Sequence, residues 1–255
     1  MKVFAIALNT AREAIRNKIL YSILLFAFLM VGISAMFGAA SIGDQMKFVK
    51  DFSLMSISLF GVIIAVVLGV NMLHKELGKK TIFNILSKPV ARWQFIAGKF
   101  FGLFATLTLV VILMCAGLIA FLAMLEGRPD WGLLLAAGTA LLELMVVVAV
   151  ALFFSSVVVT PTLAGLFTAA TFIAGRSSGY LSYFFSQDGS PALRTVSHVL
   201  YWALPHLDRF NIANQVVYGE YVDGPYVLAI GAYAAGYCGA LLLLSIAIFS
   251  RREFA

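Results

Sequence analysis

The sequence predicts an all-α membrane protein with six transmembrane helices and an amphipathic interfacial helix at the N-terminus. Of its 255 residues, 62% are hydrophobic and only 12% are charged, whereas a soluble domain is about 45–50% apolar and about 25% charged. The apolar residues form long continuous runs and do not alternate, which favours helices over a β-barrel. Lysine and arginine gather at the ends of these runs, as membrane orientation signals do.

Six apolar stretches are long enough to cross a membrane. A spanning helix needs about 20 mostly apolar residues, because the hydrocarbon core is about 30 Å thick. The six predicted spans are residues 19–40, 53–72, 101–125, 131–158, 162–184 and 226–249. Residues 1–255 are therefore expected to form a single transmembrane domain. A cleaved signal peptide is disfavoured, because the first apolar run is too long and an amphipathic segment precedes it.

Residues 3–18 are predicted to form the amphipathic helix. One side carries Phe4, Leu8, Ala11, Ile15 and, one step further, Ile19. The opposite side carries Asn9, Arg12, Glu13 and Arg16. Such a helix is expected to lie in the cytoplasmic interface plane. It either anchors the chain or also connects it, through its charged face, to a cytoplasmic partner.

The distribution of cations predicts that both termini are cytoplasmic. Twelve of the 18 Lys and Arg residues fall on the side of the N-terminus, and six of them lie between Lys75 and Lys99. Moving those six through hydrocarbon would cost on the order of 15 kcal/mol, at about 2.5 kcal/mol each. Because the positive charge follows the ends of the spans, the net charge of +6 does not indicate a nucleic-acid partner.

The segment between the second and third spans, residues 74–100, is longer than a tether requires. Ile82, Ile85 and Leu86 share one helical face, and Pro89 ends or kinks the helix that carries them. This apolar face either lies on lipid headgroups or docks into a groove of another protein. We favour docking.

The stretch "HKELGKKTIFNILSKPVARWQFIAGKF" resembles the hallmark of ABC-2 type transporter permeases. The matching positions are Glu76, Gly78, Thr81, Ile82, Ile85, Leu86, Ser87, Lys88, Pro89, Val90, Arg92, Gly98, Lys99 and Phe100. Lys80 departs from the pattern, since such permeases often have Gly before the Thr81 position. The sequence is most similar to the subgroup that acts in multi-copper enzyme maturation, such as nitrous-oxide-reductase assembly. The stretch "LPHLDRFNIANQVVYG", Leu204–Gly219, also resembles that subgroup.

The resemblance implies a type V exporter-like architecture in the inner membrane of a prokaryote. In that family the segment between the second and third spans is a coupling helix that sits in a cleft of an ATPase subunit. The implied coupling residues are Glu76, Gly78, Thr81, Ile82, Ile85, Leu86, Pro89 and Arg92. The implied partners are two copies of an ABC ATPase, which bind ATP and Mg, and a second permease subunit that makes a homodimer.

Motifs for catalysis are missing from the sequence. It contains no G-x-x-x-x-G-K-[ST] loop for ATP phosphates, no H-E-x-x-H and no G-x-S-x-G. His74, His198 and His206 are far apart, which does not favour a metal site. We therefore expect no catalytic residue, no metal and no cofactor on this chain, so a separate polypeptide must supply the energy.

Glu143 lies near the middle of the fourth predicted span. A carboxylate there costs roughly 2.5–3.5 kcal/mol unless it has a partner or water. It is either a pathway or gate residue or a structural contact. Arg176, near the outer end of the fifth span, is its candidate partner, although Arg176 could instead snorkel to the interface or lie at another depth.

The external segment, residues 186–224, is predicted to hold short amphipathic helices that lie on or dip into the outer leaflet. They act as a gate or as a stabilising cap, and their acidic character leaves a periplasmic partner open. Two alternative functions remain. One is a non-transporting member of the class that passes ATPase motion to an external maturation partner. The other is a secondary transporter or membrane enzyme, although no inverted repeat is evident.

Overall fold

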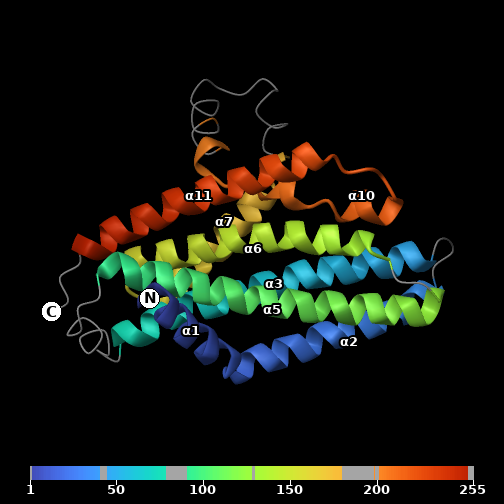
Figure 1. Cartoon of the computed structure of the whole chain (residues 1–255), viewed down its shortest axis with the longest axis horizontal. Helices are drawn as coiled ribbons and strands as arrows, with labels where there is room; N and C mark the ends of the chain where they lie inside the picture. Colours follow the sequence, from blue (N-terminus) through green and yellow to red (C-terminus); the bar gives the residue numbers. More distant parts are fainter. Residues whose placement is uncertain are drawn as a thin grey trace.

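The computed structural model describes residues 2–40, 45–78, 91–127, 130–179, 198 and 201–251. They form a bundle of long helices, with α1 and the end of α11 both lying toward the same end of the bundle (Figure 1). The elements are α1 (Lys2–Ile15), α2 (Lys18–Ala40), α3 (Gln45–Gly78), α5 (Arg92–Glu126), α6 (Gly132–Val157), α7 (Pro161–Arg176), the 3-10 helix η1 (Leu207–Phe210), α10 (Ala213–Tyr218) and α11 (Gly224–Arg251). No strand occurs within these described ranges.

Five helices are long and apolar enough to cross a membrane: α2, α3, α5, α6 and α11. The predicted span 162–184 is described only as far as residue 179. Its helix, α7, has 16 residues and ends at Arg176, so it is about 24 Å long and falls short of the roughly 30 Å hydrocarbon core. Residues 180–184 lie outside the described residues. The described residues therefore contain five helices of spanning length, whereas the sequence predicts six.

Two spanning helices begin earlier than the apolar runs indicate. Helix α3 begins at Gln45, ahead of the predicted residue 53, and α5 begins at Arg92, ahead of residue 101. The additional turns of α3 carry Lys47 and Lys50, and Lys50 forms an ion pair with Asp130 at 2.9 Å. Polar turns can extend a helix beyond the hydrocarbon, where an apolar run no longer marks it.

Helix α1 ends at Ile15, not at residue 18. The side chain of Asn17 then accepts a hydrogen bond from the Ile19 N–H at 3.0 Å and starts α2. Phe4 and Leu8, on the predicted apolar side, are exposed, Phe4 by 73%. The bundle instead contacts the side with Thr10 and Ala14, both fully buried. The apolar side is thus left for lipid.

Glycines on α5 allow α1 to lie very close. A Cβ added at Gly102 would stand 2.5 Å from the Ala7 carbonyl oxygen, and one at Gly98 would stand 2.7 Å from the Ile6 side chain. Small residues at such contacts are the usual means of packing helices together in membranes. Helices α1 and α5 therefore pack as a closely fitted pair.

Helix α6 is the centre of the bundle, with α3, α5, α7 and α11 packed around it. Four consecutive residues, Val146–Ala149, are all buried, as expected for a helix that is apolar on every side. This central position brings side chains of α6 next to α3 and α7 at mid-length.

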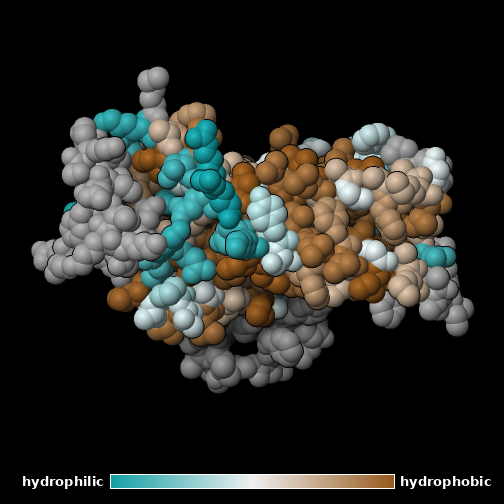
Figure 2. Space-filling model, turned by 90° about the horizontal axis from the view of Figure 1, so that it is seen from below, coloured by the Kyte–Doolittle hydropathy of each residue, from teal (hydrophilic) through white to brown (hydrophobic). Residues whose placement is uncertain are grey.

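Polar residues concentrate at one end of the bundle, which we call the basic end and define by Arg12, Arg16, Lys75, Arg92 and Arg251. Figure 2 shows hydrophilic residues gathered toward the end that carries α1 and a mostly hydrophobic surface over the rest of the described face. Helix α3 ends, α5 begins and α11 ends at this same end (Figure 1).

Candidate functional site

A charged cluster lies inside the bundle at mid-length, where Glu143 of α6, Arg176 of α7 and Ser58 of α3 meet. Nη1 of Arg176 donates to Oε1 of Glu143 at 2.6 Å, and the Ser58 hydroxyl donates to Oε2 of Glu143 at 3.1 Å. Nη1 of Arg176 also lies 3.1 Å from the Ser58 oxygen. We call these three residues the buried ion-pair cluster.

The depth of the cluster explains why it must be paired. Glu143 is 11 residues from the start of α6, about 16 Å along the helix, and its side chain is only 2% exposed. A buried carboxylate without a partner would be strongly destabilising. Arg176 is the partner that the sequence indicated. The alternatives, that Arg176 snorkels to the interface or lies at another depth, are wrong, because α7 ends beside Glu143.

Ser58 was missed by sequence reasoning. Its hydroxyl lies 8% exposed within the bundle, inside the run predicted as the second span. Ser53, Ser56 and Ser58 interrupt that run on α3, and this was the available signal. Such serines also occur in spans simply as helix-contact residues, so the signal does not by itself select Ser58.

Residues 203–213 cover the cluster from the end opposite the basic end. Leu207 and Phe210 of η1 are each 1% exposed. A Cβ added at Gly175 would stand 2.5 Å from the Pro205 carbonyl oxygen, so this segment packs directly on the last turn of α7. The Ser178 hydroxyl donates to Oδ1 of Asp208 at 2.7 Å. We call residues 203–213 the roof segment.

Three tyrosines of α11 hold the roof segment by its backbone. Tyr226 donates to the Arg209 carbonyl at 2.7 Å, and Tyr237 donates to the Ala203 carbonyl at 2.9 Å. Between them, the Tyr233 hydroxyl oxygen accepts from the His206 N–H at 3.0 Å.

These tyrosines show that the roof segment dips deeply along α11. Tyr226 and Tyr237 are 11 residues apart, about 16 Å along the helix. Irregular backbone at membrane depth must find hydrogen-bond partners within the protein, and the tyrosine hydroxyls supply three of them. The described part of the predicted external segment therefore dips into the bundle and does not only lie on its surface.

A small cavity of about 20 Å³ separates the roof segment from the cluster. Ser58, Thr139, Glu143 and Asn211 are among its lining residues. A cavity of this size holds about one water molecule, and its lining offers the two to four polar partners that a buried water needs. The contact between roof and cluster is thus suited to a single bridging water.

At the basic end, α1 is tied to α3 by an ion pair. Nζ of Lys75 lies 2.5 Å from Oε1 of Glu13. Arg12 and Arg16, the other two residues predicted for this helix, are exposed. Sequence reasoning placed Glu13 on the charged side of α1 but did not find its partner on α3.

Arg92 ties α5 to α11. Its Nη1 donates to the Ser250 carbonyl at 2.5 Å and to the Phe249 carbonyl at 3.2 Å. These carbonyls belong to the last turn of α11, where a cation is favoured by the helix dipole and by the free backbone acceptors. Lys99, about two helical turns further along α5, is 1% exposed, and its Nζ stands 5.7 Å from the Phe95 ring centroid.

Most of the predicted coupling residues lie outside the described residues. These are Thr81, Ile82, Ile85, Leu86 and Pro89. Glu76 and Gly78 fall in the last turn of α3. The described flanks show that the chain leaves α3 and enters α5 at the basic end, next to the ties made by Lys75 and Arg92.

The described histidines make structural contacts. Nε2 of His74 lies 3.2 Å from the Val158 carbonyl oxygen, which links α3 to the connection between α6 and α7. His206 packs against Tyr201 and Tyr233. Within the described ranges, no group of three or more His, Cys, Asp or Glu residues could hold a metal ion.

Comparison with known proteins bears on the whole chain. A search of curated proteins finds no match. The sequence model of the family described as "ABC-2 family transporter protein" matches residues 4–254, which include α1, the basic end, the buried ion-pair cluster and the roof segment. The all-helical fold and its five span-length helices agree with a membrane component of a transport system. The chain belongs to the ABC-2 family of transporter proteins.

Proposed function

We propose that the chain is the permease subunit of an ATP-driven ABC transporter in the cytoplasmic membrane of a prokaryote. It works with a separate ATPase subunit that binds ATP and Mg and moves a substrate outward. The family match over residues 4–254 supports this proposal. The observation that carries it is the basic end, where four helices are tied together at the two flanks of the coupling segment.

The two polar contacts at the basic end explain how a movement of the coupling segment would be transmitted to other helices. Lys75 passes motion from the end of α3 to α1 through Glu13. Arg92 passes motion from the start of α5 to the last turn of α11. An ATPase that grips the apolar face of Ile82, Ile85 and Leu86 therefore acts on four helices at once. Arg12 and Arg16 are exposed on α1 and serve as further contacts.

The finer arrangement follows the family and the distribution of charge. The basic end faces the cytoplasm, since cations collect on that side of a membrane, and both termini lie there. Two copies of the permease form a homodimer with two ATPase subunits. The subgroup of multi-copper enzyme maturation stays a hypothesis from the resemblance of residues 204–219, as does a periplasmic partner.

Within this transporter, the buried ion-pair cluster holds α3, α6 and α7 together and so keeps a gate closed. Glu143 is 2% exposed, and both its oxygens are engaged by Arg176 and Ser58, which argues against direct contact with a passing substrate. The roof segment rests on α7 beside Arg176. Movement of α7 relative to α6 would therefore loosen the pair and the roof together.

The test is the double variant Ile82→Asp/Ile85→Asp, which places charge on the apolar face of the coupling segment. We expect the variant to insert normally but to lose co-purification with the ATPase and to lose ATP turnover in the complex. Lys80→Ser, on the same segment but off that face, is the matched control and should retain both. A double variant with intact complex and turnover would contradict the coupling proposal.

The same preparation separates the alternatives. Transport of a substrate into inverted vesicles, driven by ATP and abolished by the double variant, supports the exporter. ATP turnover that depends on the permease without any transport would instead favour the non-transporting member that drives an external partner. Transport that persists without an ATPase would favour a secondary transporter.

A further inference from the structure

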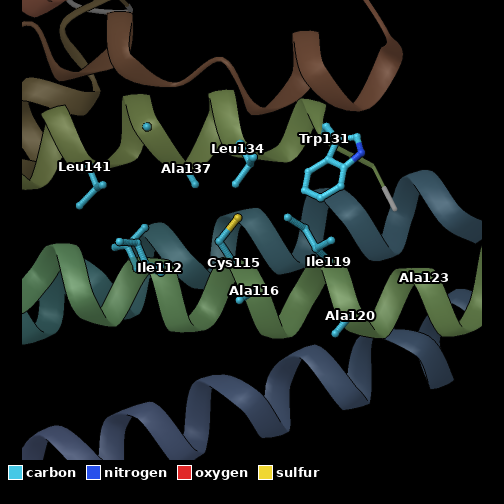
Figure 3. A pocket seen from close by; sticks show the side chains of 12 residues that line it. Ile112, Cys115, Ala116, Ile119, Ala120, Ala123, Trp131, Leu134, Ala137 and Leu141 are labelled. Atoms are coloured by element: carbon cyan, nitrogen blue, oxygen red, sulfur yellow. The ribbon is translucent and has the colours of Figure 1, made fainter. Parts of the chain in front are cut away.

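An apolar groove runs between α5 and α6 in the half of the bundle away from the basic end. Its volume is about 440 Å³. Small residues, among them Ala116, Ala120, Ala137 and Gly138, line it. Ile112, Cys115 and Ile119 of α5 point toward Leu134 and Ala137 of α6, and the Trp131 ring stands at the end of the groove (Figure 3).

The groove lies at hydrocarbon depth and is open to the surroundings. Both of its helices are long enough to span the membrane. Ile112 and Leu134 on its edges are exposed, and Trp131 is 67% exposed. Water does not fill an apolar groove inside the hydrocarbon core, and an empty one would forfeit packing contacts along its whole wall. The groove therefore needs an apolar occupant.

The length of the groove matches one leaflet of a bilayer. On α5 it runs from Val111 to Ala123, about 18 Å at 1.5 Å per residue, and on α6 from Trp131 to Leu141, about 15 Å. Half of a hydrocarbon core of about 30 Å is about 15 Å. Trp131 lies at the outer end, where an indole favours the headgroup level.

The volume favours a thin flexible chain over a second helix. A helix about 10 Å across that ran the roughly 18 Å of the groove would fill roughly 1,400 Å³, which is more than the space of about 900 Å³ that is free of protein atoms there. A methylene is about as large as a water molecule, whose share of liquid is about 30 Å³. The groove thus has room for an acyl chain but not for a whole helix.

We propose that this groove binds one acyl chain of a membrane phospholipid, with the headgroup beside Trp131. The chain lies along α5 and α6 in the leaflet opposite the basic end, and it closes a gap that the two helices leave between them. The inference depends only on the chain spanning the membrane and is independent of the ATPase.

The experiment uses the full-length protein in nanodiscs that contain a phosphatidylcholine with a diazirine near the end of one acyl chain. After photolysis, adducts are mapped to peptides by mass spectrometry. We expect adducts on residues 111–123 and 131–141 to exceed several-fold those on Leu228 and Leu243 of α11, which are more exposed than Ile112 or Leu134. Adducts that simply follow exposed area would mean ordinary boundary lipid and would overturn the proposal.

A matched pair of variants tests the groove itself. A Cβ added at Gly138 meets no atom within 4 Å, and the same holds at Gly236 of α11, so in both Gly138→Leu and Gly236→Leu the new side chain starts in open space. We expect Gly138→Leu to lower the groove adducts several-fold and Gly236→Leu to leave them unchanged. Unchanged adducts in Gly138→Leu, or disulfide-linked dimers formed by Gly138→Cys, which would place a second copy in the groove, would overturn the proposal.

Discussion

Arg176 binds Glu143 at 2.6 Å in the middle of the bundle, although 33 residues separate them and they belong to different helices. Ser58 contacts both side chains from a third helix. The pair is therefore a junction of α3, α6 and α7. Its position next to the roof segment connects the inside of the bundle with that segment.

The first prediction concerns the energy of this pair. Arg176→Leu should destabilise the protein by about 3–5 kcal/mol, because it leaves the carboxylate of Glu143, which is only 2% exposed, without its partner. Glu143→Leu should cost less, because the Arg176 side chain is 28% exposed. The double variant should be clearly more stable than the sum of the single effects predicts. Heating in detergent followed by size-exclusion chromatography measures this. Additive losses would show that the two charges do not depend on each other.

The second prediction separates gating from packing. Glu143→Gln keeps the size of the side chain but removes its charge, so assembly with the ATPase should persist while transport-coupled ATP turnover changes several-fold. Ser53→Ala is the control, since Oγ of Ser53 is buried without a hydrogen-bond partner among the described residues, and it should leave turnover unchanged. Unchanged turnover in Glu143→Gln would reduce the pair to a structural contact.

The third prediction concerns the contact between α1 and α5. Gly102→Leu would force side-chain atoms against the Ala7 carbonyl and the Thr10 side chain, so α1 should detach at a cost of about 1–3 kcal/mol or more. Labelling of a Thr10→Cys reporter, whose native side chain is fully buried, should then rise several-fold. Gly239→Leu, where a Cβ meets nothing, should leave the reporter protected.

The fourth prediction is a charge swap at the basic end. The Lys75 side chain is 52% exposed and Glu13 30%, so Lys75→Glu should change stability by less than about 1 kcal/mol. It should nevertheless lower ATP turnover in the complex, because two acids now repel at the tie between α1 and α3. Combining it with Glu13→Lys should restore turnover. If turnover is not restored, the ion pair between Lys75 and Glu13 does not transmit motion from the ATPase.

The fifth prediction concerns the tyrosines that hold the roof segment. Tyr237→Phe removes the donor to the Ala203 carbonyl, so local stability should fall by about 1 kcal/mol or somewhat more. Hydrogen exchange of residues 203–210 should accelerate roughly fivefold to tenfold. Tyr221→Phe, at a highly exposed side chain, serves as the control. Equal exchange in both variants would show that the hydroxyl does not anchor the segment.

The sequence predicted those features that a membrane requires of any protein, namely long apolar helices and a partner for a buried charge. Continuous apolar runs predicted six spanning helices, because backbone in lipid must satisfy its hydrogen bonds internally, and five helices of spanning length lie among the described residues. The need to compensate a buried carboxylate also pointed from Glu143 to Arg176. The length of α7 could not be obtained in this way, since the apolar run continues past its end. Helix α7 stops where Gly175 admits the Pro205 carbonyl, a contact set by tertiary packing.

The ties at the basic end were beyond sequence patterns for a similar reason. Lys75 and Glu13 are 62 residues apart, and Arg92 lies 158 residues from Ser250, so no local spacing links them. The sequence pattern placed α1 in the interface plane but did not indicate which of its residues contact the bundle. Small residues such as Ala14 make this contact, because close approach and not hydrophobicity drives helix packing in lipid.

The hold of α11 on the roof segment sets an order for biosynthesis. A ribosome completes residues 203–209 before it makes Tyr226, Tyr233 or Tyr237, so the segment's partners do not yet exist when it emerges. Only after the final helix has entered the bilayer can the loop behind it settle between its neighbours. Settling of the roof segment consequently follows the synthesis of α11, and a chain truncated before residue 226 would lack all three tyrosines that bind it.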